Sequence, residues 1–370
     1  ELLEITEQGN PRSYLSRAAN MTKESLIQPY GIAADNNFYM TNHQDLIFVP
    51  EVELRDNQRM AEENPVRVEV ERAVAKVVVS GVPEVVPHGD RIDNLKWGLD
   101  VTNMYTYWMR KMTFIANSGG VPNEMEQLNA GYREERYAED PNFTRFSSWN
   151  GGNPVGQFEY LSGTPELSKN FDDYDYTLEN TMDAADQRHD VTTRVVISGT
   201  YTPNGFGSVA TRNGGGISFY YFKGNAIRVE AMRDRRDMVN DRGQIPQELR
   251  DAGLEQAIEN VLAWNPNAFN SPTASFSEGG INFYYQGVCY YTVLIRHFSN
   301  NMVPVLMGYG RYGVVRNNVY QLSINKIIGP GQPVINPPGT DPDDEDTSWI
   351  SADVNIMRWD IRNQNVEELL

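Results

Sequence analysis

Short segments in which apolar and polar residues alternate recur along the chain, and this period of two is typical of β-strands. Glycine, asparagine or proline lies between many of them, as turns between strands require. The clearest segments are residues 66–71, 73–79, 192–201, 217–222, 281–285, 289–298 and 319–324. Their spacing favours a mainly β fold made of sandwiches over a parallel sheet with crossover helices.

Helical periodicity is confined to a few places. Pro246 suits the first turn of a helix, and the pattern ends before Asn265-Pro266. A second helix or helical turn is expected over residues 311–317. The apolar stripe of the first helix comprises Leu249, Leu254, Ile258, Val261 and Leu262.

The C-terminal region combines a linker and a strand. Residues 329–346 read GPGQPVINPPGTDPDDED, rich in proline and acid, and we expect this linker not to pack. Residues 348–356 then alternate as a strand does, and the alternation resumes, shifted by one, at Met357. The shift predicts a bulge or bend between Ile356 and Met357.

A terminal strand with an apolar face is a surface that proteins usually cover. Three arrangements are open. The strand pairs with another subunit by β-augmentation, it closes its own domain, or its first part pairs locally and its second part is exported.

Composition narrows the possible partners. The chain has 370 residues, 40% of them hydrophobic, which is typical of a globular protein with ordinary cores. A net charge of −18 argues against nucleic acid or an anionic membrane surface. No apolar run is long enough to span a bilayer. Glu1 begins neither a signal peptide nor a lipid-attachment site, so any export signal is expected outside this sequence.

The sequence carries no recognisable catalytic or metal-binding pattern. The four histidines lie far apart, and the single cysteine, Cys289, sits in a strand-like run that indicates a small core residue. The acidic run 341–346 lacks the glycine and glutamate of an EF-hand loop. We therefore expect no enzyme activity, no metal and no cofactor.

Two further patterns have a structural and a functional interpretation. Asp172, Asp173 and Asp175 suit either a glycosidase cleft or a charged loop, and accidental pairs of acids favour the loop. Aromatic groups at residues 105–108 and 284–285 suit either sugar stacking or a sandwich core. Strand spacing favours the core.

Short motifs in a consistent order then indicate a family. They are FYMTN at 38–42, VERAVAKV at 70–77, LKW at 95–97, YTLEN at 176–180 leading into TTRVV at 192–196, GVCYY at 287–291, YGVVRNNVY at 312–320 and VNIMRW at 354–359 after the acidic linker. In these motifs the chain resembles fimbrillins of the Bacteroidota type V pilus class, above all the major stalk subunits of the Mfa-like branch.

The resemblance implies export as a lipoprotein and two transthyretin-like (Greek-key) β-sandwich domains with a few short helices. It implies that a trypsin-like protease removes the first strand, and that the C-terminal strand of a neighbouring subunit fills the opened groove. Residues 316–320, RNNVY, are then a structural signature. Only 37 residues precede FYMTN, so the N-terminal domain is expected to lack its first strands, with the cleavage site upstream.

These inferences define the expected organisation: an N-terminal sandwich at 1–185, a C-terminal sandwich at 186–328, a linker at 329–346 and a donor strand segment at 347–370. The resemblance implies a stalk subunit on the outer membrane that binds copies of itself and accessory subunits. The alternative is a tip or accessory fimbrillin that binds host glycans or proteins. The expected donor residues are Trp349, Ile350, Ala352, Val354, Ile356, Trp359, Ile361 and Val366.

Overall fold

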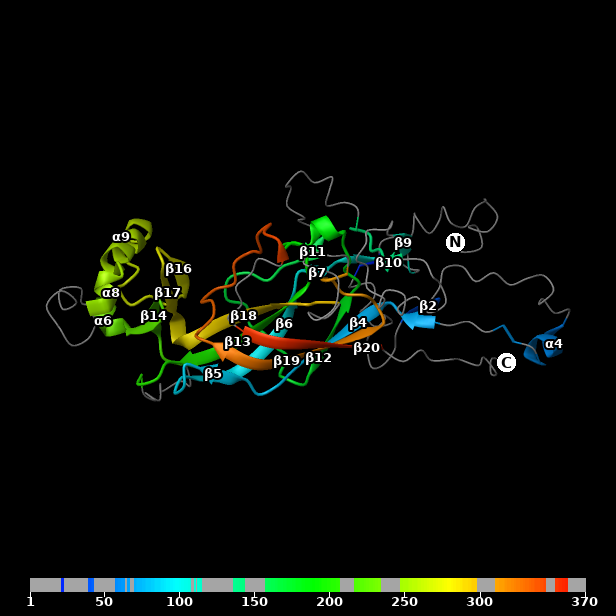
Figure 1. The fold of residues 1–370 in the computed structure, drawn as a ribbon, viewed down its shortest axis with the longest axis horizontal. Helices are drawn as coiled ribbons and strands as arrows, with labels where there is room; N and C mark the ends of the chain where they lie inside the picture. The colour runs from blue at the N-terminus through cyan, green and yellow to red at the C-terminus, as the bar shows by residue number, and fades with distance from the viewer. Residues whose placement is uncertain are drawn as a thin grey trace.

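The computed structural model describes residues 21–22, 39–42, 57–63, 65–66, 70–107, 110, 112–114, 136–143, 157–206, 216–233, 247–297, 310–343 and 350–358. Strands dominate these residues, and the prediction of a mainly β fold is confirmed. Figure 1 shows an elongated molecule with the sandwich in the middle and most of the helices at one end.

The strands are β1 (Met21–Thr22), β2 (Met40–Asn42), β3 (Val70–Arg72), β4 (Val74–Ser80), β5 (Glu84–Val86), β6 (Arg91–Asp100), β7 (Thr102–Asn103), β8 (Tyr105–Thr106), β9 (Met112–Phe114), β10 (Arg136–Ala138), β11 (Phe158–Glu159), β12 (Tyr174–Leu178), β13 (Arg194–Thr202), β14 (Phe219–Phe222), β15 (Asn225–Arg228), β16 (Phe276–Glu278), β17 (Ile281–Tyr284), β18 (Val288–Leu294), β19 (Asn318–Ile328) and β20 (Ile350–Arg358). The helices are α4 (Gln58–Glu63), α6 (Val229–Arg233), α8 (Gln247–Asp251) and α9 (Leu254–Trp264), with 3-10 turns η3 (Ala184–Asp186) and η4 (Tyr285–Gly287).

Two sheets form the central sandwich. The larger one runs β12-β4-β19-β20, with β5 also paired to β19, and the smaller one runs β18-β13-β6. Strand β19 is parallel to β4 and antiparallel to β20. The core between the sheets contains fully buried side chains from both, including Val77, Trp97, Ile197 and Leu322. Burial of this apolar surface stabilises the sandwich.

Both sheets combine strands from either side of residue 185. In the smaller sheet β6 pairs with β13, and in the larger sheet β4 pairs with β19. Strands on the two sides of the expected boundary therefore share one core, and residues 183–190 do not separate two sheets. The Greek-key topology of transthyretin stays a prediction.

A third sheet, β15-β14-β17-β16, links the sandwich to the helical end. Its two faces belong to different cores because side chains alternate along each strand. Phe219 and Tyr284 stack at 4.7 Å between ring centroids and join the sandwich core. Tyr220 and Phe283, also 4.7 Å apart, join a second core with α6, α8 and α9.

The helix predicted before Asn265 is present, in two parts. Gly253, with a φ of 91°, separates α8 from α9, and α9 ends at Trp264. Leu249, Leu254, Ile258 and Val261 of the predicted stripe are buried in the second core. None of the helices in the described part of the chain has the length and apolarity needed to cross a bilayer.

The helix predicted over residues 311–317 is wrong. Tyr312 and Val314 form bridges with Arg296 and Asn180, and Gly313 has a φ of 123°, which a helix does not accommodate. Strand bridges and buried side-chain contacts stabilise this segment more than its helical propensity does.

Candidate functional site

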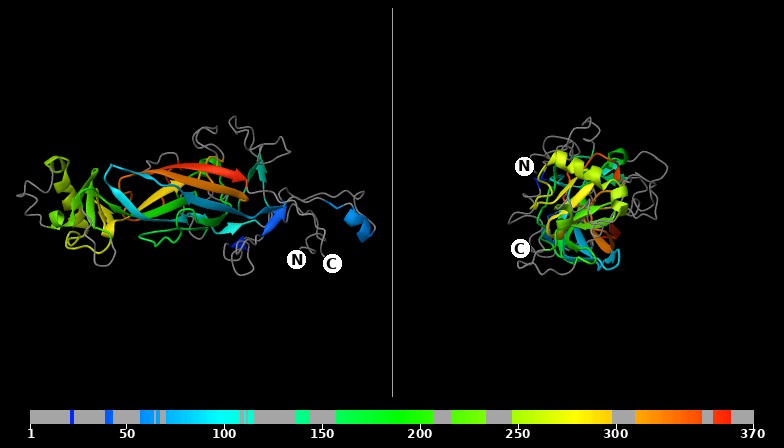
Figure 2. Two further views of the ribbon diagram at one scale, coloured as in Figure 1. Left: turned by 90° about the horizontal axis from the view of Figure 1, so that it is seen from below. Right: turned by 90° about the vertical axis from the view of Figure 1, so that its left-hand side faces the viewer.

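Strand β20 lies at the edge of the larger sheet, where its described partner strand is β19 (Figure 2). The pairing is antiparallel from Asn318 opposite Arg358 to Ile327 opposite Ile350. Among the arrangements left open by the sequence, residues 350–358 adopt the one in which the strand completes its own sheet.

The irregularity in this pairing lies on β19, at Asn325. The register shifts between Ile324 and Lys326, so Asn325 is an extra residue opposite β20. Ile324 and Ile327 are three residues apart and both fully buried, which a regular period of two would not permit. The bulge predicted between Ile356 and Met357 is wrong, because pairing continues there without a shift.

The apolar side chains of β20 that the structure describes face the sandwich. Ala352 and Val354 are half-buried against the core and lie opposite the buried Ile324 and Leu322. Between them, the exposed Asp353 accepts a hydrogen bond of 2.7 Å from the Asn325 side-chain amide. The bulge residue therefore contacts β20 directly.

The expected donor residues divide into two groups. Ile350, Ala352, Val354 and Ile356 lie on β20, with Ile356 opposite Tyr320 in the register. Trp349, Trp359, Ile361 and Val366 lie outside the described residues.

The linker before β20 packs against the sandwich, contrary to the expectation from its composition. We call residues 329–343 the strap. In the strap, the backbone of Gln332 exchanges two hydrogen bonds of 2.8 Å with the backbone of Tyr290. The backbone of Ile335 exchanges hydrogen bonds of 2.8 and 2.7 Å with the backbone of Gly163. Ile335 is buried in a cluster with Tyr290. Apolar anchors and backbone bonds thus hold a segment whose acids and prolines indicated a solvated spacer.

Close backbone approach explains a glycine at the start of the strap. Gly331 has a φ of 57°, and a Cβ there would lie 2.4 Å from the Tyr290 carbonyl oxygen. A residue with a Cβ would be strained here by the positive φ and would also clash with this oxygen, so glycine is required.

Asp343 fixes the far end of the strap. Its carboxylate is buried and accepts a hydrogen bond of 2.5 Å from the Thr192 hydroxyl. Its backbone N–H donates to Gln187, and its carbonyl accepts from the Tyr312 hydroxyl. Six residues, 344–349, connect this anchor to β20.

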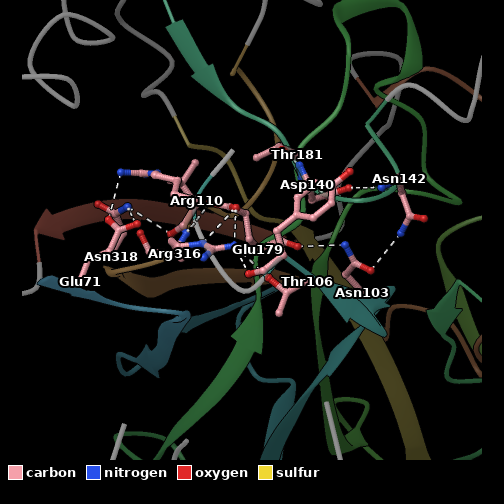
Figure 3. Close-up of polar contacts among 12 residues, drawn as sticks. Glu71, Asn103, Thr106, Arg110, Asp140, Asn142, Glu179, Thr181, Arg316 and Asn318 are labelled. Atoms are coloured by element: carbon pink, nitrogen blue, oxygen red, sulfur yellow. Dashed lines mark hydrogen bonds and ion pairs between the residues drawn. The ribbon is translucent and has the colours of Figure 1, made fainter. Parts of the chain in front are cut away.

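A network of buried polar side chains supports the start of β19 (Figure 3). Arg316 and Glu179 are fully buried and form an ion pair at 3.1 Å. The Arg316 guanidinium also donates to the Thr106 hydroxyl and the Tyr107 carbonyl. A second buried pair, Arg110 with Glu71 at 3.0 Å, lies in the same close-up. Pairing and hydrogen bonds offset the desolvation of these charges.

The network continues through amides to Asp140. The Asn103 amide donates to the Glu179 carbonyl, and the Asn142 amide donates to Asn103. The Asp140 carboxyl accepts from the backbone N–H groups of Asn142 and Thr181. Burial raises the pKa of Asp140 to about 8, although these N–H groups act to lower it.

The RNNVY segment gains a physical explanation from these contacts. Arg316 anchors to Glu179, and the side-chain oxygen of Asn317 accepts a hydrogen bond from the backbone N–H of Arg72. The Asn318 amide donates to the carbonyls of residues 315 and 316. The Tyr320 hydroxyl accepts from Val315 and lies 2.7 Å from Nδ1 of His297. The segment connects β19 to elements distant in sequence.

The candidate chemistries in the sequence have structural explanations. Cys289 is fully buried, and burial raises the pKa of its thiol to about 12. The Asp173 carboxylate accepts hydrogen bonds from the backbone N–H and the side-chain amide of Asn170. These hydrogen bonds lower the pKa of the carboxyl and indicate a turn. Tyr284 is a core residue. Within the described residues there is no cluster of three metal-ligating side chains.

The fold and the edge strand define a class of protein: a mainly β sandwich in which the last described strand, β20, pairs with β19 and forms the edge of the larger sheet. Residues 282–365, from β17 through β20, match the family described as "Major fimbrial subunit protein type IV, Fimbrillin, C-terminal". Over these residues the chain is similar to the fimbrillins, and the resemblance predicted from the sequence motifs is confirmed there. The matched family is described as a fimbrial subunit.

Solved structures of low sequence identity are similar over most of this chain. A fimbrilin from Porphyromonas gingivalis is 16% identical, with a TM-score of 0.35, covering 80% of this chain and 60% of that chain. A proposed cell adhesion protein from Parabacteroides distasonis is 13% identical, with a TM-score of 0.33, covering 79% and 60%. The chain therefore spans about 60% of the length of these relatives. No curated protein matches it.

Sequence reasoning missed the residues that position β20. Asn325 had no signal beyond the spacing of Ile324 and Ile327, which a bulge explains. Asp343 had no sequence signal, because one buried aspartate cannot be distinguished within a run of acids. Thr192 had no signal either, because its contact with Asp343 exists only in the folded chain. The Arg316–Glu179 pair is separated by 137 positions and required the fold.

Proposed function

We propose that this protein is a structural subunit of a surface fimbria and that its C-terminal strand joins it to a neighbouring copy. The observation that carries the proposal is the place of β20. It is an edge strand, in the region that matches fimbrillins, and it follows a connection of only six residues from a fixed anchor.

The energetics of β20 suit exchange between copies. Ala352 and Val354 are half-buried, so leaving the sheet exposes less apolar surface than leaving the centre of the core would. Backbone hydrogen bonds lost to β19 are regained when the strand pairs with another sheet edge. Export as a lipoprotein, protease maturation and a stalk position are part of the proposal by resemblance.

The test compares the full chain with a chain truncated after Asp346. We expect filaments of the full chain in negative-stain microscopy, heat-resistant ladders on denaturing gels, and neither after truncation. The Val354→Asp variant places a charge against the core and should form no filaments. The control variant, Asn355→Thr, changes the next residue along β20 without adding a charge and should still form filaments. Unchanged filaments after truncation would contradict the proposal.

A second candidate function, adhesion, is favoured by Trp264. This residue is 53% exposed at the end of α9, and its indole ring contacts the ring of Phe276. Exposed aromatic rings suit stacking on sugars or contact with a protein. A glycan-array signal that Trp264→Ala abolishes while filaments persist would support an adhesive subunit. Absence of any signal from the wild type would exclude glycan binding.

A further inference from the structure

We propose that Trp264 of α9 and Glu278 of β16 form a binding site for one neutral sugar residue, whose ring stacks on the indole. The inference rests on the second candidate function, adhesion, and specifies the class of ligand and the residues that bind it. It does not depend on β20 or on the joining of subunits.

The indole of Trp264 is a platform that packing holds in place. Its ring contacts that of Phe276 at 5.3 Å between centroids, and Phe276 contacts Phe283 at 5.6 Å within the core under the helices. Trp264 is thus the outermost ring of a series that begins in the core, and it remains 53% exposed. A ring that is already oriented loses little conformational freedom when a ligand binds.

Polar groups lie beside this platform because α9 and β16 are neighbours at the helical end (Figure 1). Asn260 lies one turn before Trp264 on the same face of α9. A Cβ placed on Gly279 would lie 3.0 Å from the Asn260 Cβ, so the chain passes along the last turns of the helix from Phe276 to Gly279. The exposed Glu278 shares the face of its strand with Phe276, and this face is directed at α9.

A ring, an amide and a carboxylate together suit a sugar. The C–H groups of a pyranose stack on an indole, and its hydroxyl groups bind amides and carboxylates. The Asn260 side-chain oxygen accepts a hydrogen bond of 3.2 Å from the Gln256 amide, so its NH2 group is the donor that faces a ligand. One oxygen of Glu278 accepts from the backbone N–H of Gly279 at 3.2 Å, which orients the carboxylate and leaves the second oxygen for hydroxyl groups.

The size of the apolar surface favours a sugar over a protein. Within residues 216–233 and 247–297, Trp264 is the only large hydrophobic residue that is exposed, so the apolar patch is a single ring. Stable protein interfaces bury about 800 Å² on each partner around a larger apolar centre. One face of one pyranose matches the patch.

The local charge disfavours anionic sugars. Residues 251–295 contain four acids and neither lysine nor arginine. Lys223 donates to the carbonyl of Ala252, which precedes α9 and lies at the opposite end of that helix from Trp264. The carboxylate of a sialic acid would therefore meet Glu278 without a cation to compensate it, and like charges repel at short range.

Saturation-transfer NMR on the full chain tests the site. The neutral probes are methyl β-D-galactopyranoside and methyl β-D-glucopyranoside, and the anionic probe is N-acetylneuraminic acid. We expect saturation of the C–H protons of at least one neutral probe, with a Kd on the order of 1 mM, and none of the anionic probe. Repetition of such a weak site along a fibre would raise the overall affinity.

Variants assign the binding to these residues. Trp264→Ala should weaken binding of the neutral probe about tenfold, whereas Trp264→Phe keeps a ring against Phe276 and should retain most of it. Glu278→Gln should weaken binding about fivefold, because hydrogen bonds to charged groups are the stronger ones. The matched control is Glu255→Gln, which removes the same charge on the opposite side of α9 and should leave binding unchanged.

The outcomes separate this site from the fibre. Equal binding by the wild type and Trp264→Ala, failure of both neutral probes, or preference for the anionic probe would overturn the inference. If such a chain still forms filaments that require the residues after Asp346, the proposed subunit function stands. A chain that binds a neutral probe through Trp264 and Glu278 but forms no filaments would support the sugar site and contradict the subunit function.

Discussion

Arg316 and Glu179 are fully buried, so each charge depends on the other for its compensation. Removing one partner leaves an uncompensated charge in the protein interior. We expect Arg316→Met to lower the free energy of unfolding by about 3–5 kcal/mol in urea denaturation. Arg316→Met/Glu179→Met should cost less than the sum of the single changes, because no buried charge remains.

The matched control for this pair is on the surface. Arg59 and Glu63 of α4 are also an ion pair, at 3.4 Å, but both side chains are exposed. Arg59→Met should change the free energy of unfolding by no more than about 1 kcal/mol. Equal losses at Arg316 and Arg59 would show that the buried pair has no special role.

His297 gives the stability a pH dependence. Burial, with a smaller contribution from Arg110, lowers its pKa from 6.5 to about 3. Between these values the unfolded chain binds one more proton than the folded chain, so the free energy of unfolding falls as the pH is lowered. From pH 7 to pH 5 the wild type should lose about 2 kcal/mol more than His297→Gln. Parallel curves for the two proteins would contradict this.

At the scale of elements, the strap and β19 show how local signals are changed by packing. Alternation correctly predicted a strand over 319–324, but β19 continues to Ile328 because the bulge returns Ile327 to the core. The strap has the composition of a solvated linker, yet its bonds to Tyr290, Gly163 and Thr192 hold it in place.

A single hydroxyl tests the anchor of the strap. Thr192→Val keeps the shape of the side chain but removes the donor to the buried Asp343 carboxylate. We expect a loss of about 1.5–3 kcal/mol in the free energy of unfolding, since hydrogen bonds to charged groups are the stronger ones. Thr177→Val is the control, because among the described residues that buried hydroxyl donates a hydrogen bond to the carbonyl of the next residue, Leu178, at 3.3 Å, and not to a charged group. Equal effects would argue against the anchor.

At the scale of the whole molecule, two hydrophobic cores share the sheet of β14 to β17. Leu254 belongs to the core under the helices, and Leu322 belongs to the sandwich core. Leu254→Ala should cost about 2–5 kcal/mol. We expect amide exchange to accelerate in α8 and α9 while β13 stays protected, whereas Leu322→Ala should accelerate exchange in β13. Equal acceleration at both ends in Leu254→Ala would show one cooperative unit.

Several elements were predictable because their signals are local. Alternation identified the strands that became β4, β13 and β19, and the apolar stripe from Leu249 to Val261 identified the helical end. The segment 311–317 was not predictable, because its conformation follows from the contacts of Arg316 and from bridges to distant residues.

The sequence by itself determined which segments form strands and helices, the globular character of the chain and its likeness to fimbrillins, because periodicity and short motifs depend on neighbouring residues. Only the tertiary structure decided that strands from both sides of residue 185 share a core, that the strap packs, and that β20 pairs with β19. The physical reason is that an amphipathic strand fits any suitable edge, and the choice among edges depends on contacts between residues far apart in the chain.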